Sequence, residues 1–146
     1  MEGVNLERVN LREAYLGEAN LERADLRGAN LAGASLGNAN LVSANLREAN
    51  LEGAELEEAD LWGANLGRAV LEEALLRQAS LIRTNLDGAT LTNAYLWETQ
   101  RSGWSIKNII CEAVYWDEEG MKLTQYVPGE FERLYADTLK IRHYRV

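Results

Sequence analysis

Glu55, Glu57 and Glu58 lie within four positions of one another, a spacing that could supply a general acid and a general base. Such a pair needs a cleft that excludes water, and a cluster of glutamates is more typical of a solvated charged face. The sequence holds one histidine, His143, which leaves little material for a Ser-His-Asp triad or a multi-histidine metal site. No GxxxxGK[ST] phosphate loop is present. We therefore expect no catalytic residues, no cofactor and no metal.

The charge of the chain is distributed unevenly. Residues 1–100 carry 16 acidic and 8 basic side chains, whereas residues 101–146 carry 7 of each, so the net charge of −8 belongs to the first part. Direct binding to nucleic acid or to an anionic membrane requires a basic patch, and we expect neither. No stretch is apolar enough to span a bilayer, and residues 1–10 lack the features of a signal peptide. With a single cysteine, Cys111, an intrachain disulfide is excluded, and we expect a cytoplasmic protein.

Leucine recurs at every fifth position from Leu6 to Leu96, and a small residue, usually alanine, precedes most of these leucines by two positions. Five residues advance an α-helix by about 500°, which forms no stripe, and an odd spacing alternates between the two faces of a strand. The pattern fits a coil in which each repeat forms one short side and one corner. Alanine and leucine then point inward. Glycine and asparagine are frequent in the two positions after leucine, where a tight corner needs a positive φ.

The segments AELEE, ADLWG and ANLGR together span residues 54–68 and are read as the pattern A(N/D)LXX, with Glu55 as the one departure. In this pattern the chain resembles the pentapeptide-repeat family. The resemblance implies an all-β fold, a right-handed quadrilateral β-helix with four repeats per coil. Continued beyond Leu96, the frame places Arg101, Ile106, Cys111 and Trp116 in the central position. We predict a β-helix of about five to six coils over residues 1–116, with Cys111 as a buried structural thiol.

Residues 117–146 differ in character from the repeats. They predict a turn over 117–120, an extended segment, a helix that follows Pro128 and Gly129, and a final strand over 140–146. The spacing of Phe131, Leu134, Tyr135 and Thr138 would place them on one face of this helix. We expect this short α/β segment to cap the last coil, or alternatively to dock another chain. The first coil has no comparable cover, so we expect it to be exposed or to pair with a second copy as a homodimer.

Residues 20 apart should stack on one outer face if each coil holds four repeats. Val42, Trp62 and Ile82 then form an outward apolar strip, which is our candidate protein-contact site. The alternative is that Val42 and Ile82 are only β-forming residues on a solvated sheet. A second apolar cluster should be covered by the tail, and its members are Val70, Leu75, Tyr95, Trp97, Ile110 and Tyr115.

One face should be distinctly acidic. Its candidate residues are Glu18, Glu55, Glu57, Glu58 and Glu98. We interpret the chain as a non-enzymatic interaction or structural module with a protein partner and no small-molecule substrate. The alternative is a DNA mimic of the quinolone-resistance type, the branch of the family that binds DNA gyrase. Against it, Phe131 is the one phenylalanine, whereas that branch commonly places phenylalanine in central positions, and Arg77 interrupts the acidic row.

Overall fold

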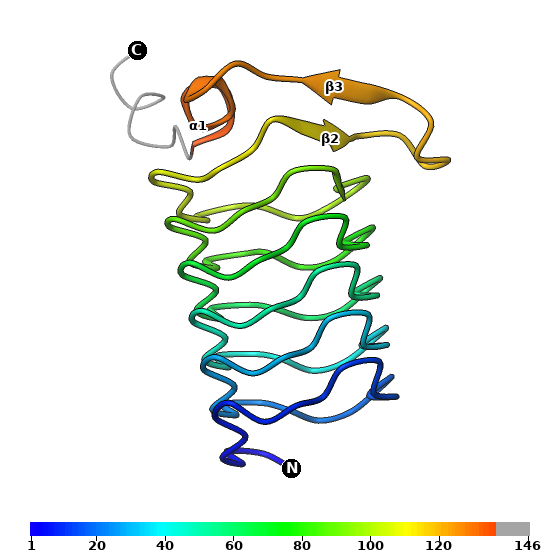
Figure 1. Ribbon diagram of the computed structural model, residues 1–146, viewed down its shortest axis with the longest axis vertical. Helices are drawn as coiled ribbons and strands as arrows, with labels where there is room; N and C mark the ends of the chain where they lie inside the picture. Colours follow the sequence, from blue (N-terminus) through cyan, green and yellow to red (C-terminus); the bar gives the residue numbers. More distant parts are fainter. Residues whose placement is uncertain (137–146) are drawn as a thin grey trace.

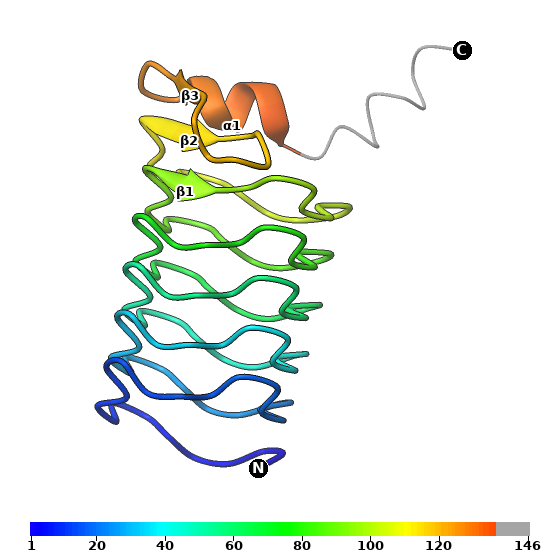
Figure 2. The same ribbon diagram turned by 90° about the vertical axis from the view of Figure 1, so that its right-hand side faces the viewer.

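The computed structural model describes residues 1–136, which form a column of stacked coils (Figure 1). Parallel β-bridges join residues 20 apart, in an unbroken series from Asn5–Asp25 to Thr90–Ile110. The two ends of this series lie at opposite ends of the column (Figure 2). Thr138, the predicted final strand and His143 lie outside the described residues.

Each corner is a tight turn closed by one backbone hydrogen bond. The Ala54 N–H donates to the Leu51 C=O at 3.0 Å, and the same bond recurs in almost every repeat. The second residue after leucine has a positive φ, as the third position of a type II turn requires. Glycine suits this position, as at Gly63 (φ 64°), although Glu58 adopts it too (φ 57°). The prediction that glycine in either position after leucine serves a positive φ was too broad. Gly17, Gly37 and Gly67 occupy the first of these positions, where φ is not positive.

Where asparagine or aspartate precedes a leucine, its side chain holds the backbone of the following corner. Asn50 Oδ1 accepts the N–H of Glu52 at 3.0 Å, and Asn65 Oδ1 accepts the N–H of Gly67 at 2.9 Å. Asparagine and aspartate readily form this local bond to a backbone N–H two residues on. Their preference at this position therefore reflects corner formation.

The interior of the column is filled with alanine and leucine, as predicted. Every leucine of the frame from Leu21 to Leu96 is buried, as is nearly every alanine two positions before it. In the first coil Leu6, Leu11 and Leu16 are only half-buried, because this coil has a neighbour on one side. Thr84 replaces an inward alanine, and its hydroxyl donates to the Leu61 C=O at 2.7 Å.

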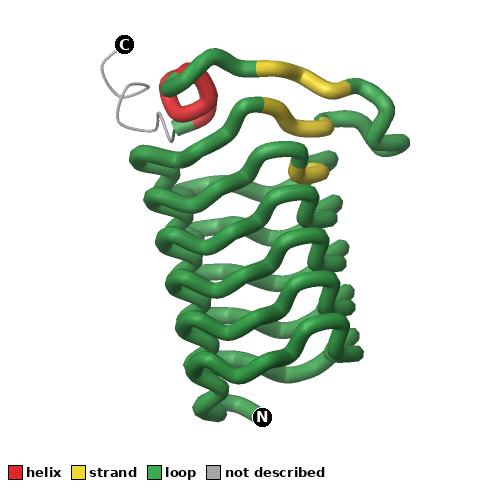
Figure 3. Tube along the Cα trace, viewed as in Figure 1, coloured by secondary structure: helices red, strands yellow, loops and turns green. Residues whose placement is uncertain are grey.

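At the C-terminal end three strands form a small sheet. β1 (Ala94–Tyr95) pairs in parallel with β2 (Ala113–Tyr115), and β2 pairs antiparallel with β3 (Leu123–Gln125). The helix α1 (Glu130–Tyr135) follows Gly129 and lies beside the last coil (Figure 3). Among residues 1–136 no helix is long and apolar enough to cross a membrane.

Aromatic side chains join α1 to the last coil. The buried Phe131 ring lies 6.2 Å, centroid to centroid, from both Trp104 and Trp116. Trp104 Nε1 donates to the Tyr135 C=O at 2.9 Å, and Trp116 Nε1 donates to the Tyr126 hydroxyl at 2.7 Å. These contacts form one aromatic layer between α1 and the last coil.

The second apolar cluster is covered only in part, so that expectation was too broad. Gly120 packs on the Tyr95 ring, and Tyr95 stacks on Tyr115 at 4.5 Å between centroids. Ile110, however, remains 54% exposed. The reason is the path of the chain: it turns at 117–120 and runs back beside β2 as β3, which extends the edge of the sheet and does not cross its outer face.

Candidate contact surface

Val42, Trp62 and Ile82 lie on three consecutive coils. The N–H of Ser43 donates to the Trp62 C=O, and the N–H of Gly63 donates to the Ile82 C=O, both at 2.9 Å. Trp62 is 39% exposed, whereas Val42 and Ile82 are half-buried. The three side chains therefore form the predicted outward apolar strip, while its role as a contact site remains a prediction.

Local backbone geometry fixes the direction of Trp62. Asp60 Oδ1 accepts the Trp62 N–H at 3.0 Å, and the preceding Leu61 is buried in the core. The guanidinium carbon of Arg83 lies 5.7 Å from the centroid of the Trp62 indole ring, within cation–π range. Arg83 forms no ion pair with any residue between 1 and 136. The strip thus combines the exposed indole of Trp62 with a guanidinium that can form an ion pair with a carboxylate.

The five candidate acidic residues do not form one continuous face. Glu55, Glu57 and Glu58 share one coil, but on the next coil Arg77 Nη1 lies 3.4 Å from Glu57 Oε1. Glu98 lies two coils above Glu58, where its carboxylate accepts a hydrogen bond from Gln78 Nε2 at 3.2 Å. Glu18 lies two coils below Glu58, and the residue between them on this face, Asn38, is uncharged. The acidic groups are therefore separated along the column.

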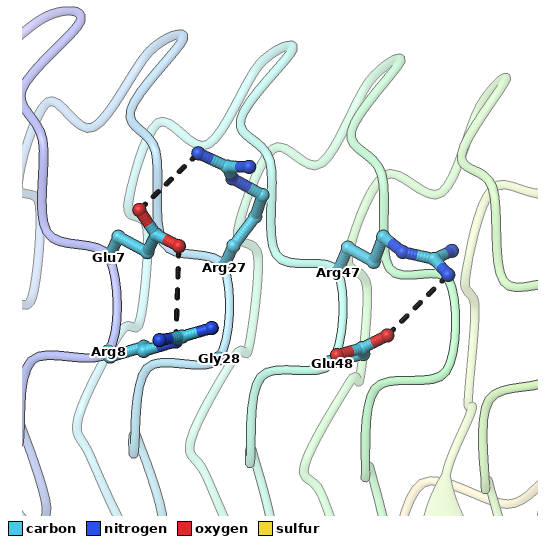
Figure 4. Close-up of a pocket in the computed structure, with 6 residues that line it drawn as sticks. All are labelled: Glu7, Arg8, Arg27, Gly28, Arg47 and Glu48. Carbon is cyan, nitrogen blue, oxygen red and sulfur yellow. Dashed lines mark hydrogen bonds and ion pairs between the residues drawn. The ribbon is translucent and has the colours of Figure 1, made fainter.

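A shallow hollow of about 190 Å³ lies on another face of the column, over the first three coils (Figure 4). Its lining residues are Glu7, Arg8, Arg27, Gly28, Arg47 and Glu48. Glu7 Oε2 lies 3.5 Å from Arg27 Nη2, and Glu48 Oε1 lies 3.5 Å from Arg47 Nη2. Arg27 also holds Asp25 through a side-chain hydrogen bond, which lowers the pKa of that exposed carboxyl. The hollow is thus an open row of ion pairs in which acid and base offset each other.

Cys111 is 7% exposed, as its inward position predicts. Burial raises the pKa of its thiol to about 12, so the thiol is protonated near neutral pH and is a poor nucleophile. Within residues 1–136 there is no group of three histidine, cysteine, aspartate or glutamate side chains placed to hold a metal ion. Neither feature supports chemistry at Cys111.

The aromatic surroundings of Arg101 are a feature that the sequence did not reveal. Arg101 occupies an inward position of the frame, and its guanidinium carbon lies 4.7 Å from the Trp116 ring centroid and 5.5 Å from that of Trp104. Burial lowers the pKa of Arg101. The frame did place Trp116 in an inward position. The third aromatic partner, Tyr135, comes from α1, and its position could not be predicted from the frame. Arg101 therefore joins the last coil to the aromatic layer.

A family model described as pentapeptide repeats matches the chain in 8 copies, over residues 5–41, 24–63 and 63–97. These matches together cover more than half of the chain. The chain belongs to the pentapeptide-repeat family. No curated protein matches this pentapeptide-repeat protein.

Two solved pentapeptide-repeat structures are similar to it. One, from the thylakoid lumen of Arabidopsis thaliana, is 35% identical with a TM-score of 0.57, over 58% of this chain and 59% of that chain. The match thus spans less than two-thirds of the plant protein. Rfr23, from the cyanobacterium Cyanothece 51142, is 34% identical with a TM-score of 0.54, over 80% of this chain and 86% of that chain. QnrB1, a plasmid-mediated fluoroquinolone resistance protein, is 15% identical with a TM-score of 0.33, over 75% of this chain and 78% of that chain, too distant for an argument about function.

Proposed function

We propose that this pentapeptide-repeat protein is a non-enzymatic interaction module whose protein partner binds the strip of Val42, Trp62 and Ile82. The observation that carries the proposal is the 39% exposure of Trp62 between two further apolar side chains. Tryptophan that becomes buried at an interface often supplies much of the binding energy. The partner should present an apolar patch for the indole ring and a carboxylate for Arg83.

The proposed architecture serves this role as a rigid support. We propose a right-handed β-helix of about five to six coils over residues 1–116, with residues 117–146 as its C-terminal cap. The aromatic contacts of Phe131 with Trp104 and Trp116 support the cap. We also propose a cytoplasmic location, in keeping with the single buried thiol of Cys111. In this proposal Glu18, Glu55, Glu57, Glu58 and Glu98 maintain solubility or meet a basic partner.

The acidic groups give less support to a DNA mimic. A phosphate ladder would place negative charge on successive coils, whereas Arg77 follows Glu57 on the next coil and pairs with it. We therefore expect the purified chain to leave DNA supercoiling by gyrase unchanged. Inhibition at a concentration near that of the enzyme would favour the mimic over the contact strip.

The contact strip can be tested with two matched tryptophan variants. Trp62→Ser removes the centre of the strip, and Trp97→Ser removes a half-buried tryptophan on a different face. Partners captured from the native host by the wild-type chain would be purified, and their affinities for both variants measured by calorimetry. We expect Trp62→Ser to weaken binding by about 2 kcal/mol or more, and Trp97→Ser to have little effect.

Two controls accompany this measurement. Circular dichroism of both variants should match that of the wild-type chain, because each change lies outside the core. A photo-reactive residue at position 62 should crosslink to the partner, whereas one at position 97 should not. Undiminished affinity of Trp62→Ser for every captured protein would show that the strip is not the contact site.

A further inference from the structure

Within the described part of the chain, β3 forms the open edge of the sheet at the C-terminal end of the column. The strand order is β1-β2-β3, so only one side of β3 is paired within residues 1–136. All three of its residues, Leu123 to Gln125, are exposed. Exposed apolar side chains also flank it, with Met121 at 78% and Val127 at 65%. An edge strand of this kind is a template for another strand.

The pairing of β3 with β2 shows which backbone groups are directed outward. The Tyr126 N–H donates to the Glu112 C=O at 2.8 Å, and residues of an antiparallel pair alternate between bonded and non-bonded positions. Thr124 is therefore bonded to Val114, whereas Leu123 and Gln125 direct their N–H and C=O groups away from β2. Tyr115 and Ala113, which lie opposite them on β2, support this assignment. Their C=O groups accept N–H groups from the preceding coil and so point away from β3.

We propose that two copies of this chain dimerise by pairing their β3 strands antiparallel about a two-fold axis at Thr124. Leu123 of each copy then lies opposite Gln125 of the other, and the two residues exchange both backbone hydrogen bonds. Met121 lies opposite Val127 of the second copy, which buries the two most exposed apolar side chains of this segment. The same edge is thus complementary to itself, as an isologous dimer requires.

Side-chain caps limit this pairing to the centre of the edge. The Met121 N–H is already bonded to Asp117 Oδ2 at 3.0 Å, and the Val127 N–H to Glu130 Oε2 at 2.9 Å. Only Leu123 and Gln125 are left to bond, so the pairing has one register. A two-fold pairing in one register uses the β3 edge of both copies, so this contact closes at two copies.

The distribution of charge favours a second copy at this end of the column. Residues 1–100 carry 16 acidic against 8 basic side chains and would repel the same region of another copy. Residues 101–146, which include β3, carry 7 of each. The dimer therefore forms where the repulsion between copies is least, and it does not depend on the Trp62 strip.

Sedimentation equilibrium of the full-length chain over a wide concentration range tests the proposal. We expect a reversible change from 16.3 kDa to twice this mass. Gln125→Pro removes an outward N–H, and Leu123→Lys places a charge opposite Gln125 of the second copy, diagonal to the same charge on that copy. Each should raise the dimer dissociation constant at least about tenfold. Tyr15→Lys, in the first coil, is the matched control and should leave dimerisation unchanged, because Tyr15 is also exposed and outward but lies at the opposite end.

Hydrogen exchange provides an independent measurement. The amides of Leu123 and Gln125 should become more protected as the concentration of the wild-type chain rises, while those of the first coil should not. If Gln125→Pro alters the circular dichroism spectrum, Leu123→Lys decides the test, because it changes an exposed side chain and no backbone group. A chain that stays monomeric at about 1 mM, or a dimer lost in Tyr15→Lys and kept in Leu123→Lys, overturns the proposal.

Discussion

Truncation of one central leucine should be far more costly than truncation of its counterpart in the first coil. Leu56 is fully buried, and its N–H donates to the Leu75 C=O of the next coil at 2.7 Å. Leu36 and Leu76 occupy the same position on the coils below and above and are also buried, so a cavity at Leu56 cannot fill with solvent. We expect Leu56→Ala to lower the free energy of unfolding by about 3–5 kcal/mol.

Leu11 provides the matched control, because it has the same position in the repeat but is only half-buried. Full burial of a leucine contributes about 2 kcal/mol, so Leu11→Ala should cost about 1 kcal/mol. Guanidinium unfolding followed by far-ultraviolet circular dichroism would measure both changes, with the slope of the transition as a check on cooperativity. Equal costs for the two variants, or a cost below about 1 kcal/mol for Leu56→Ala, would refute a shared interior of stacked leucines.

Three further predictions concern Thr84, Gly120 and Cys111. Thr84→Val keeps the shape of the side chain but removes the hydrogen bond to the Leu61 C=O, and unfolding in denaturant should show a loss of about 1 kcal/mol. Gly120→Ala would place its Cβ 2.5 Å from Tyr95 Cε1, so it should lower the melting temperature more than Gly53→Ala, which has a similar φ but no atom within 4 Å. Burial raises the pKa of Cys111 from 9.0 to about 12, so the folded chain keeps a proton that the unfolded chain loses in this range. The stability that this thiol contributes is complete below pH 9.0 and is lost as the pH rises toward about 12. Denaturant titrations at several pH values would measure this decline, and Cys111→Ala should flatten it. An unchanged dependence of stability on pH in Cys111→Ala would contradict the role given to this thiol.

The inward and outward positions of the repeat could be predicted from the sequence because the spacing is regular. Leu61 and Trp62 are adjacent and differ in burial, with 1% and 39% exposure, and this difference follows from the five-residue frame alone. The frame also predicted that Cys111 would be buried, although no leucine occupies its repeat. A rigid repeat determines the direction of each side chain locally, so no long-range contact was needed for these predictions.

The tail depends on contacts between segments far apart in the sequence, and there the sequence was less informative. The direction of β3 follows from the turn at 117–120, which packs on Tyr95 about one coil earlier. Arg101 departs from the leucine frame, and its three aromatic partners come from the last coil and from α1. The sequence predicted that Arg77 interrupts the acidic row, but not its ion pair with Glu57, which depends on side-chain conformation.

Cysteine accessibility over one repeat tests most directly whether the chain forms a closed column that presents its functional groups outside. Asp60→Cys, Leu61→Cys and Trp62→Cys would each be made in a Cys111→Ala background and treated with a thiol reagent under native conditions. Cys111 shows that the leucine position accepts a cysteine. The thiols introduced at 60 and 62 should react at rates near that of an exposed thiol, and the one at 61 should react at least about a hundredfold more slowly. Similar rates at 61 and 62 would contradict the inward and outward assignment on which the Trp62 contact strip depends.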